Sequence, residues 1–241
     1  MGDYADYLRA MADAYDVASP DLEVEEKPQY DGYSDWAQTY DHEPENPVIA
    51  GEDLVLPRLL SPLRKATVLD VGAGTGRHAV PLARAGSRVT AVEPNDEMLS
   101  RAKQKTGAAG LTIEFMPGDA YCPLDDARVF DLVLCCLVLS HVSDLRRAIG
   151  ALAARVDADG HLVVTDFHPY NLLVGMRTSY GHKKVKYNVP NSIHLPSEYV
   201  ELAVENGLSL VSFHESGCIP GFPRMPATLV FVFARRALVG V

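Results

Sequence analysis

The chain has 241 residues, a length that fits one or two domains. Hydrophobic residues make up 47% and charged residues 22%, a balance typical of soluble globular proteins that excludes collagen-like and disordered chains. The net charge is −10, because the chain has 32 acidic and 22 basic side chains. This sign disfavours nucleic acid as a partner, since phosphate backbones bind basic surfaces.

Apolar runs, cysteines and the first residues favour a cytoplasmic protein. No apolar run is long enough to span a bilayer, and the N-terminus lacks the pattern of a secretory signal. Two of the four cysteines, Cys135 and Cys136, are neighbours in an apolar segment, which indicates neither a disulfide framework nor a zinc site. We therefore expect a reduced protein with no membrane partner and no metal.

The acidic charge is concentrated at the start of the chain. Residues 1–50 hold 13 acidic and two basic side chains, whereas the remainder is close to neutral. Apolar and aromatic side chains at helical spacing predict helices over residues 3–17, 33–40 and 52–60, with a linker over 18–30. We expect residues 1–60 to form an N-terminal helical lid region and residues 61–241 to form the main domain.

From residue 66 onward, short apolar strands alternate with helices. The predicted strands are residues 67–71, 88–92, 111–115, 130–136, 160–166, 208–215 and 228–235. The predicted helices are residues 77–85, 96–105, 145–155 and 197–206. This alternation predicts an α/β fold with a parallel sheet that has helices on both faces. Ligands of such sheets bind at the carboxyl ends of the strands.

A glycine-rich loop follows the first predicted strand of this domain. Gly72, Gly74 and Gly76 alternate with other residues, which lets the backbone turn sharply and approach a ligand closely. A dinucleotide site has the pattern G-x-G-x-x-G, but Arg77 stands where the third glycine would fall. The spacing therefore favours a smaller nucleotide-like ligand over NAD, whose oxidoreductases remain a disfavoured alternative.

Acidic residues follow the next two strands. Glu93 lies 19 residues after Gly74, where a carboxylate can accept hydrogen bonds from a ribose diol. Met98 can cover a base with a soft apolar face. Asp119 can accept a hydrogen bond from an exocyclic amine, and Tyr121 can pack on the ring.

These motifs, VLDVGAGTGRHAV, Glu93, GDA and FDLVLCCLVLSHV, stand in an order that resembles the S-adenosylmethionine-dependent methyltransferases of the Rossmann-like class. The resemblance covers roughly residues 33–235. It implies a seven-stranded, mostly parallel sheet with one inserted antiparallel strand, S-adenosylmethionine as cofactor and S-adenosylhomocysteine as product. Together the motifs and the resemblance predict a cofactor site of Asp70, Gly72, Ala73, Gly74, Gly76, Glu93, Pro94, Met98, Asp119, Ala120, Tyr121, Cys136, Leu137 and His141.

A sulfonium methyl group is already activated, so such an enzyme must chiefly hold a nucleophile in line with it and accept a proton where the nucleophile has one. His168 and His194 are the candidate catalytic bases, because both lie near strand ends or in the long insert over residues 167–196. His168 could equally be a structural histidine, and for His194 the structural interpretation is the favoured one.

The acceptor pocket must come from the lid region and the insert, because the core motifs supply only the cofactor site. Candidate substrate-binding residues are Tyr7, Tyr33, Trp36, Tyr40, Tyr170 and Met176. Aromatic walls suit a flat or apolar small molecule, and the acidic charge nearby suits a cationic one. The first helix could instead be a plain packing helix or a dimer contact.

We interpret the chain as a methyltransferase that acts on an oxygen, nitrogen or carbon atom of a small-molecule acceptor, as a monomer or homodimer. The acidic charge and the lack of an Asn/Asp-Pro-Pro-Tyr/Phe motif after residue 136 argue against nucleic-acid substrates. The main alternative is a protein of the same fold that binds S-adenosylmethionine for a non-methylating reaction.

Overall fold

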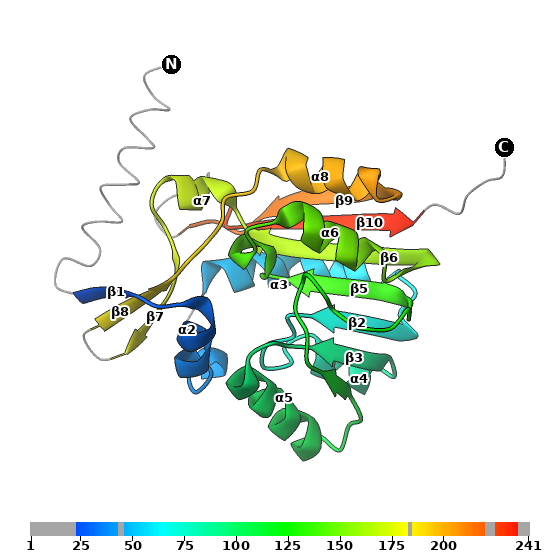
Figure 1. Ribbon diagram of the computed structural model, residues 1–241, viewed down its shortest axis with the longest axis horizontal. Helices are drawn as coiled ribbons and strands as arrows, with labels where there is room; N and C mark the ends of the chain where they lie inside the picture. Colours follow the sequence, from blue (N-terminus) through cyan, green and yellow to red (C-terminus); the bar gives the residue numbers. More distant parts are fainter. Residues whose placement is uncertain (1–22, 43–45, 183–184, 220–224, 236–241) are drawn as a thin grey trace.

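The computed structural model describes residues 23–42, 46–182, 185–219 and 225–235. A seven-stranded sheet with the order β4-β3-β2-β5-β6-β10-β9 lies at the centre of the fold (Figure 1). Its strands are β2 (Thr67–Val71), β3 (Arg88–Val92), β4 (Glu114–Met116), β5 (Phe130–Cys136), β6 (Val156–Phe167), β9 (Leu208–Ser216) and β10 (Thr228–Arg235). Strand β10 runs antiparallel to both of its neighbours, β6 and β9, whereas the other pairs of neighbouring strands in this sheet are parallel. This topology confirms the predicted fold class.

Helices cover both faces of the sheet, so its central strands are largely buried. All seven residues of β5 are buried. The helices packed along the sheet or at its ends are α3 (Pro47–Leu60), α4 (Ala79–Arg84), α5 (Asp96–Ala108), α6 (Leu145–Ala153) and α8 (Pro196–Glu205). Side chains of α6 and α8 share one core cluster with Leu69 and Val71, whereas those of α3 and α4 share another with Val68. Successive residues of β2 thus face opposite layers.

The start of α3 differs from the predicted helix over residues 52–60. Asn46 caps this helix, because its side chain accepts a hydrogen bond from Val48 N at 3.0 Å. Pro47 then occupies the first helical position, where a missing N–H costs nothing. The predicted helix therefore began too late, at residue 52.

A second, smaller sheet has the order β1-β8-β7 and contains β1 (Glu23–Glu26), β7 (Thr178–His182) and β8 (Val185–Val189). Helix α2 (Gln29–Trp36) follows β1, and α7 (Pro169–Leu173) lies at the start of the insert. The predicted linker over 18–30 is therefore wrong where it is described. Strand β1 lies inside that predicted linker. It pairs with β8, more than 150 residues away, and the local sequence does not reveal such a partner.

The predicted helix over 3–17, with Tyr7, lies outside the described residues. Two short 3₁₀ turns, η1 (Tyr40–His42) and η2 (Leu139–His141), complete the fold. Within the described ranges, no helix combines the length and the apolar character needed to cross a membrane.

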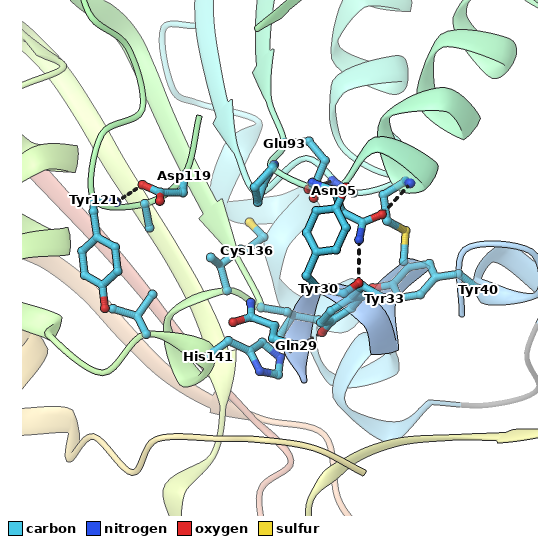
Figure 2. Close-up of a pocket in the computed structure, with 18 residues that line it drawn as sticks. Gln29, Tyr30, Tyr33, Tyr40, Glu93, Asn95, Asp119, Tyr121, Cys136 and His141 are labelled. Carbon is cyan, nitrogen blue, oxygen red and sulfur yellow. Dashed lines mark hydrogen bonds between the residues drawn. The ribbon is translucent and has the colours of Figure 1, made fainter. Parts of the chain in front are cut away.

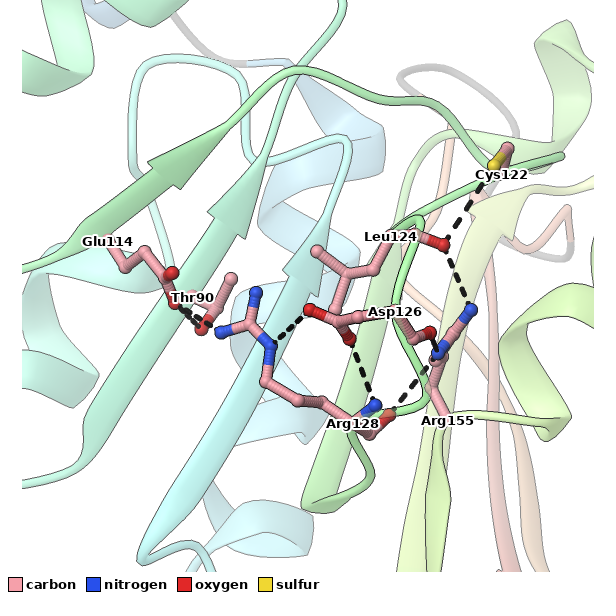
Figure 3. A network of polar contacts seen from close by, with 7 residues as sticks. All are labelled: Thr90, Glu114, Cys122, Leu124, Asp126, Arg128 and Arg155. Carbon is pink, nitrogen blue, oxygen red and sulfur yellow. Dashed lines mark hydrogen bonds and ion pairs between the residues drawn. The ribbon is translucent and has the colours of Figure 1, made fainter.

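A polar network braces the loop between β4 and β5, which contains Asp119 and Tyr121 (Figure 3). Arg128 forms ion pairs with Glu114 at 2.6 Å and with Asp126 at 2.7 Å. Arg155 donates a hydrogen bond to the backbone oxygen of Leu124 at 2.9 Å. These contacts tie the loop to β4 and to the start of β6, and so fix its path past the sheet edge.

Phe231 of β10 is the centre of the aromatic core. It is fully buried and stacks on Tyr199 and Phe213, with ring centroids 5.1 and 4.8 Å away. We expect Phe231→Ala to lower the free energy of unfolding by about 3–5 kcal/mol, because it leaves a cavity in a packed core. Urea unfolding measures this change. The control is Leu210→Ala, which truncates a side chain that is 42% exposed and should change stability by about 0.5 kcal/mol or less. Equal losses in the two variants would contradict this account of the core.

Candidate functional site

A cavity of about 300 Å³ opens at the carboxyl ends of β2, β3 and β5 (Figure 2). The glycine loop forms part of its wall. Gly72, Gly74 and Gly76 have positive φ angles of 72°, 56° and 82°. A Cβ atom at Gly72 would lie 2.3 Å from Cγ2 of Val138, so a larger residue would clash there. The glycines therefore let the loop turn and pass close to the end of β5.

Glu93, at the end of β3, is held by two backbone N–H groups. Gly74 N donates to its Oε2 at 2.8 Å, and Asn95 N donates to its Oε1 at 2.9 Å. Only 8% of the residue is exposed. Burial raises the pKa of Glu93 to about 7, although both hydrogen bonds favour the ionised form. Each carboxylate oxygen accepts one hydrogen bond from these two groups. Both oxygens therefore retain lone pairs that can accept hydrogen bonds from a ligand in the cavity.

Asn95 connects the cavity to helix α2. Its Oδ1 accepts hydrogen bonds from Glu97 N and Met98 N, both at 3.1 Å, and so caps α5. Its Nδ2 donates to the backbone oxygen of Tyr30 at 2.8 Å and to Oγ of Ser34 at 2.9 Å. One buried side chain therefore fixes the start of α5 and the position of α2.

The opposite wall of the cavity is the loop after β4. Figure 2 shows Asp119 and Tyr121 across the cavity from Tyr30, Tyr33 and Tyr40. Oδ1 of Asp119 accepts hydrogen bonds from Tyr121 N and Cys122 N at 2.8 and 2.9 Å, which makes a tight turn.

Most of the predicted cofactor residues meet in this cavity. The lining includes Gly72, Gly74, Glu93, Pro94, Met98, Asp119, Ala120, Tyr121, Cys136, Leu137 and His141. Ala73 and Gly76 belong to the same loop but do not line the cavity, and neither does Asp70. Asp70 is fully buried behind the loop, where it accepts a hydrogen bond from the backbone of Ala79 at the start of α4.

The sequence analysis missed five lining residues, which are Gln29, Tyr30, Asn95, Val138 and Val142. A signal for Asn95 existed, because an asparagine directly before the acidic start of a predicted helix is a typical N-cap. Gln29 and Tyr30 fell in the predicted linker, and no local pattern places them at the cavity.

A second cavity, of about 270 Å³, adjoins the first. The two share Tyr33, Tyr40, Leu137 and His141 in their walls. Leu137 has a φ of +58°, the single positive value at a non-glycine residue in the described part of the chain. Such a backbone is strained for leucine, and strain of this kind is concentrated at functional sites.

Of the predicted substrate-binding residues, Tyr33, Trp36, Tyr40 and Met176 line the second cavity. Tyr170 does not; half of it is exposed, and its ring packs against His168.

Neither predicted catalytic histidine lines either of these two cavities. His168 donates from Nε2 to Glu215 at 2.9 Å and accepts a bond from Tyr170 N at Nδ1, at 3.3 Å. Both of its nitrogens are therefore engaged in structural hydrogen bonds. His194 is buried and donates from Nε2 to the backbone oxygen of Val142 at 2.7 Å.

His141 instead occupies the shared wall, together with Tyr33. Its Nδ1 lies 2.8 Å from the backbone oxygen of Pro190, which can only accept, so Nδ1 holds the proton of the neutral ring. Nε2 is then an acceptor for the Tyr33 hydroxyl, 2.8 Å away. Burial lowers the pKa of His141 and raises that of Tyr33. Both groups are thus neutral near pH 7.

One further cluster lies behind the glycine loop. Ligand atoms of Glu52, His78 and Cys136 all lie within 4.8 Å of one another. The fully buried Glu52 is already paired with Arg77 and His78, each at 2.7 Å. A guanidinium group on the same carboxylate disfavours a bound cation. We interpret the cluster as a charge pairing that ties α3 to the start of α4.

Comparison with known proteins agrees with this geometry. Residues 69–164 match the family described as "Methyltransferase domain". The chain contains a domain of the S-adenosylmethionine-dependent methyltransferase family. This confirms the predicted family and cofactor. A "Ubiquinone biosynthesis O-methyltransferase" of Coxiella burnetii is 30% identical over 155 residues, which are 62% of this chain and 66% of the relative. The match thus spans just under two thirds of that relative's length.

Solved structures show the same fold. An S-adenosylmethionine-dependent methyltransferase from Clostridium acetobutylicum aligns with a TM-score of 0.67 and 16% identity, over 85% of this chain and 99% of that one. A magnesium protoporphyrin IX methyltransferase from Synechocystis with bound S-adenosylhomocysteine has a TM-score of 0.64 and 19% identity, over 86% and 95% of the two chains.

The pKa of Glu93 predicts that cofactor binding depends on pH. Ribose hydroxyls donate to an ionised carboxylate, so protonation of Glu93 below pH 7 should weaken binding. We expect the affinity for S-adenosylhomocysteine to fall by about tenfold from pH 8 to pH 6, measured by calorimetry. Glu93→Gln should bind more weakly at pH 8 and lose this dependence. Glu97→Gln, an exposed control on α5, should retain it. A wild-type affinity that is constant over this range would contradict the assignment.

The two donor bonds of Asn95 predict a local effect on α2. Asn95→Asp keeps the Oδ1 acceptor that caps α5 but removes the donors to Tyr30 and Ser34. We expect about 1–3 kcal/mol less stability and faster hydrogen exchange over residues 29–36, with α5 unchanged. Ser34→Ala, which removes one of the two partners, should have a smaller effect. Unchanged exchange in α2 would show that other contacts hold it.

Proposed function

We propose that this chain transfers a methyl group from S-adenosylmethionine to a hydroxyl oxygen of a small, flat acceptor. The observation that supports this most is the pair of adjoining cavities, which share Tyr33, Tyr40, Leu137 and His141. Methyl donor and acceptor must meet in line at close range, and two cavities with a common wall allow this. The Coxiella relative is named as an O-methyltransferase, which favours oxygen as the methylated atom.

The first cavity fits S-adenosylmethionine. Glu93 offers a buried carboxylate to a ribose, and Gly74 leaves open space, because a Cβ atom there would have no neighbouring atom within 4 Å. Met98 and Ala120 add apolar surface for a base, and Asp119 lines the cavity next to Ala120. When bound, S-adenosylmethionine supplies a methyl group activated by a sulfonium, so the chain needs no nucleophile of its own.

The second cavity fits the acceptor. Tyr33, Trp36 and Phe167 give it aromatic walls, and Met176 adds a flexible apolar side chain. Flat aromatic surfaces bind a ring and exclude water from the reacting atoms. Because α2 supplies Tyr33 and Trp36, we propose that the described part of the N-terminal region acts as a cap over the acceptor.

Tyr33 and His141 can accept the proton of the acceptor hydroxyl. As the acceptor oxygen bonds to the methyl carbon and the S–C bond breaks, the hydroxyl proton passes to Oη of Tyr33, and the proton of Tyr33 moves to Nε2 of His141. His141 is neutral because burial lowers its pKa, so Nε2 has a lone pair for this proton. The site loses the sulfonium charge as the imidazolium charge forms, so no net charge is added to a buried region.

The direct test is turnover. The full chain is incubated with S-adenosylmethionine and either a panel of phenols or a metabolite extract, and mass spectrometry detects S-adenosylhomocysteine together with a product heavier by one methylene. We expect S-adenosylhomocysteine and the methylated product to form in equal amounts. A chain that binds S-adenosylhomocysteine but methylates nothing in either mixture would support the non-methylating alternative instead.

The proton relay predicts a specific defect. His141→Gln should lower kcat/KM for a phenol by about 10²–10⁴-fold, and Tyr33→Phe should lower it less. In the wild type, kcat/KM should stay level above the pKa of His141. In His141→Gln it should rise with pH until the acceptor hydroxyl ionises without help. His161→Gln, a histidine that lines neither cavity, is the matched control. Identical pH profiles in wild type and His141→Gln would exclude the relay.

A further inference from the structure

We propose that the acceptor is an aromatic compound with a carboxylate or similar anionic group, and that Arg177 binds this group. The inference rests on the proposed function, because it names the substrate class of the same second cavity. It opposes the expectation from composition, since the acidic N-terminal region suggested a cationic acceptor.

The charge on the walls of the second cavity has one sign. Among the described residues that line it, Arg177 is the one with a permanent formal charge. No described carboxylate contributes to these walls. An aromatic cage for a cation gains from nearby carboxylates and loses from a guanidinium group, so the described surroundings disfavour a cationic acceptor.

The guanidinium group of Arg177 is held in place without being neutralised. Its Nη1 donates to the backbone oxygens of Leu172 and Met176 at 3.0 and 2.7 Å. Within the described ranges, no carboxylate lies within ion-pair distance of it, unlike Arg77, Arg128 and Arg146. Two carbonyl partners fix the orientation of the fork but leave its positive charge uncompensated. A fixed guanidinium is suited to bidentate binding of a carboxylate.

Three other polar side chains of this cavity have partners of their own. Oδ1 of Asn46 caps α3, and Oγ1 of Thr178 accepts a hydrogen bond from Asn191 at 2.9 Å. Ser140 forms a hydrogen bond with the buried Asp166. The remaining wall is mainly aromatic and aliphatic, with Trp36, Phe167 and Met176 as its large members. This combination selects a ring with an anionic substituent.

The placement also orients the acceptor. Arg177 precedes β7, in the insert, whereas Tyr33 and His141 lie in the wall that the two cavities share. An acceptor whose anionic group contacts Arg177 is thus anchored at a residue outside that shared wall. Its hydroxyl group is then free to approach Tyr33 and the methyl donor.

Trp36 gives a direct readout, because it is the sole tryptophan of the chain and lines the second cavity. The full chain, saturated with S-adenosylhomocysteine, is titrated with 4-hydroxybenzoate, 4-hydroxybenzamide and 4-hydroxybenzylamine while Trp36 fluorescence is recorded. These probes share a ring and a hydroxyl but differ in charge. We expect the benzoate to bind about 10- to 100-fold more tightly than the amide, and the amine to bind most weakly.

Variants of Arg177 test whether this residue causes the preference for the benzoate. Arg177→Met should bind benzoate and amide with equal affinity, and Arg177→Lys should restore part of the preference. Arg58→Met is the control, because Arg58 is exposed, donates to a single backbone oxygen and lines neither cavity. We expect it to behave as wild type.

The pH is held at 8, where Glu93 is ionised. The other titratable groups that line the two cavities are Asp119, His141, Cys136, Tyr30, Tyr33, Tyr40 and Tyr121.

Two outcomes would overturn the inference: equal binding of benzoate and amide by the wild type, or a preference that persists in Arg177→Met. A parallel assay with S-adenosylmethionine separates these failures from that of the proposed function. If the amide is methylated as well as the benzoate, the methyltransferase proposal stands and the role of Arg177 is wrong. If no probe quenches Trp36 and none is methylated, the assignment of the second cavity fails as well.

Discussion

The carboxylate of Glu93 is the contact on which the rest of the site depends. Backbone N–H groups from the glycine loop and from the start of α5 both donate to it, so one buried charge fixes two loops at once. Burying a carboxylate costs free energy, and two hydrogen bonds offset only part of that cost, as the raised pKa shows. The loops are thereby held apart at a spacing that leaves the first cavity open between them.

Helices α2 and α3 and the turn η1 are joined to these same loops. Asn95 holds α2, Thr75 of the glycine loop donates to Asp41 at 2.7 Å, and Glu52 of α3 pairs with Arg77. The segments that form the wall of the second cavity are thus positioned by the segments that form the first. In this arrangement the wall of the second cavity is built on that of the first, so a displacement of one loop would change both cavities.

The shared wall brings backbone strain close to His141, the proton acceptor that we propose. Leu137 turns the chain out of β5 with a positive φ, and its N–H group is retained by Thr165 O at 2.8 Å. This turn is followed directly by the 3₁₀ turn that contains His141. A residue with an unfavourable backbone conformation persists where surrounding contacts over-determine it, and here those contacts come from the sheet itself.

The sequence alone determined the parallel sheet, the glycine loop and the position of Glu93, because each depends on local periodicity or on the fixed spacing of a strand–helix–strand unit. It did not single out His141, the proton acceptor that we propose. His168 and His194 follow strands or end the insert just as His141 does, and only their partners distinguish them. Nor did it reveal the pairing of β1 with β8, or that Arg177 rather than an acidic side chain lines the second cavity. Tertiary structure decided these points, because contacts between residues 100 or more positions apart leave no local pattern in the chain.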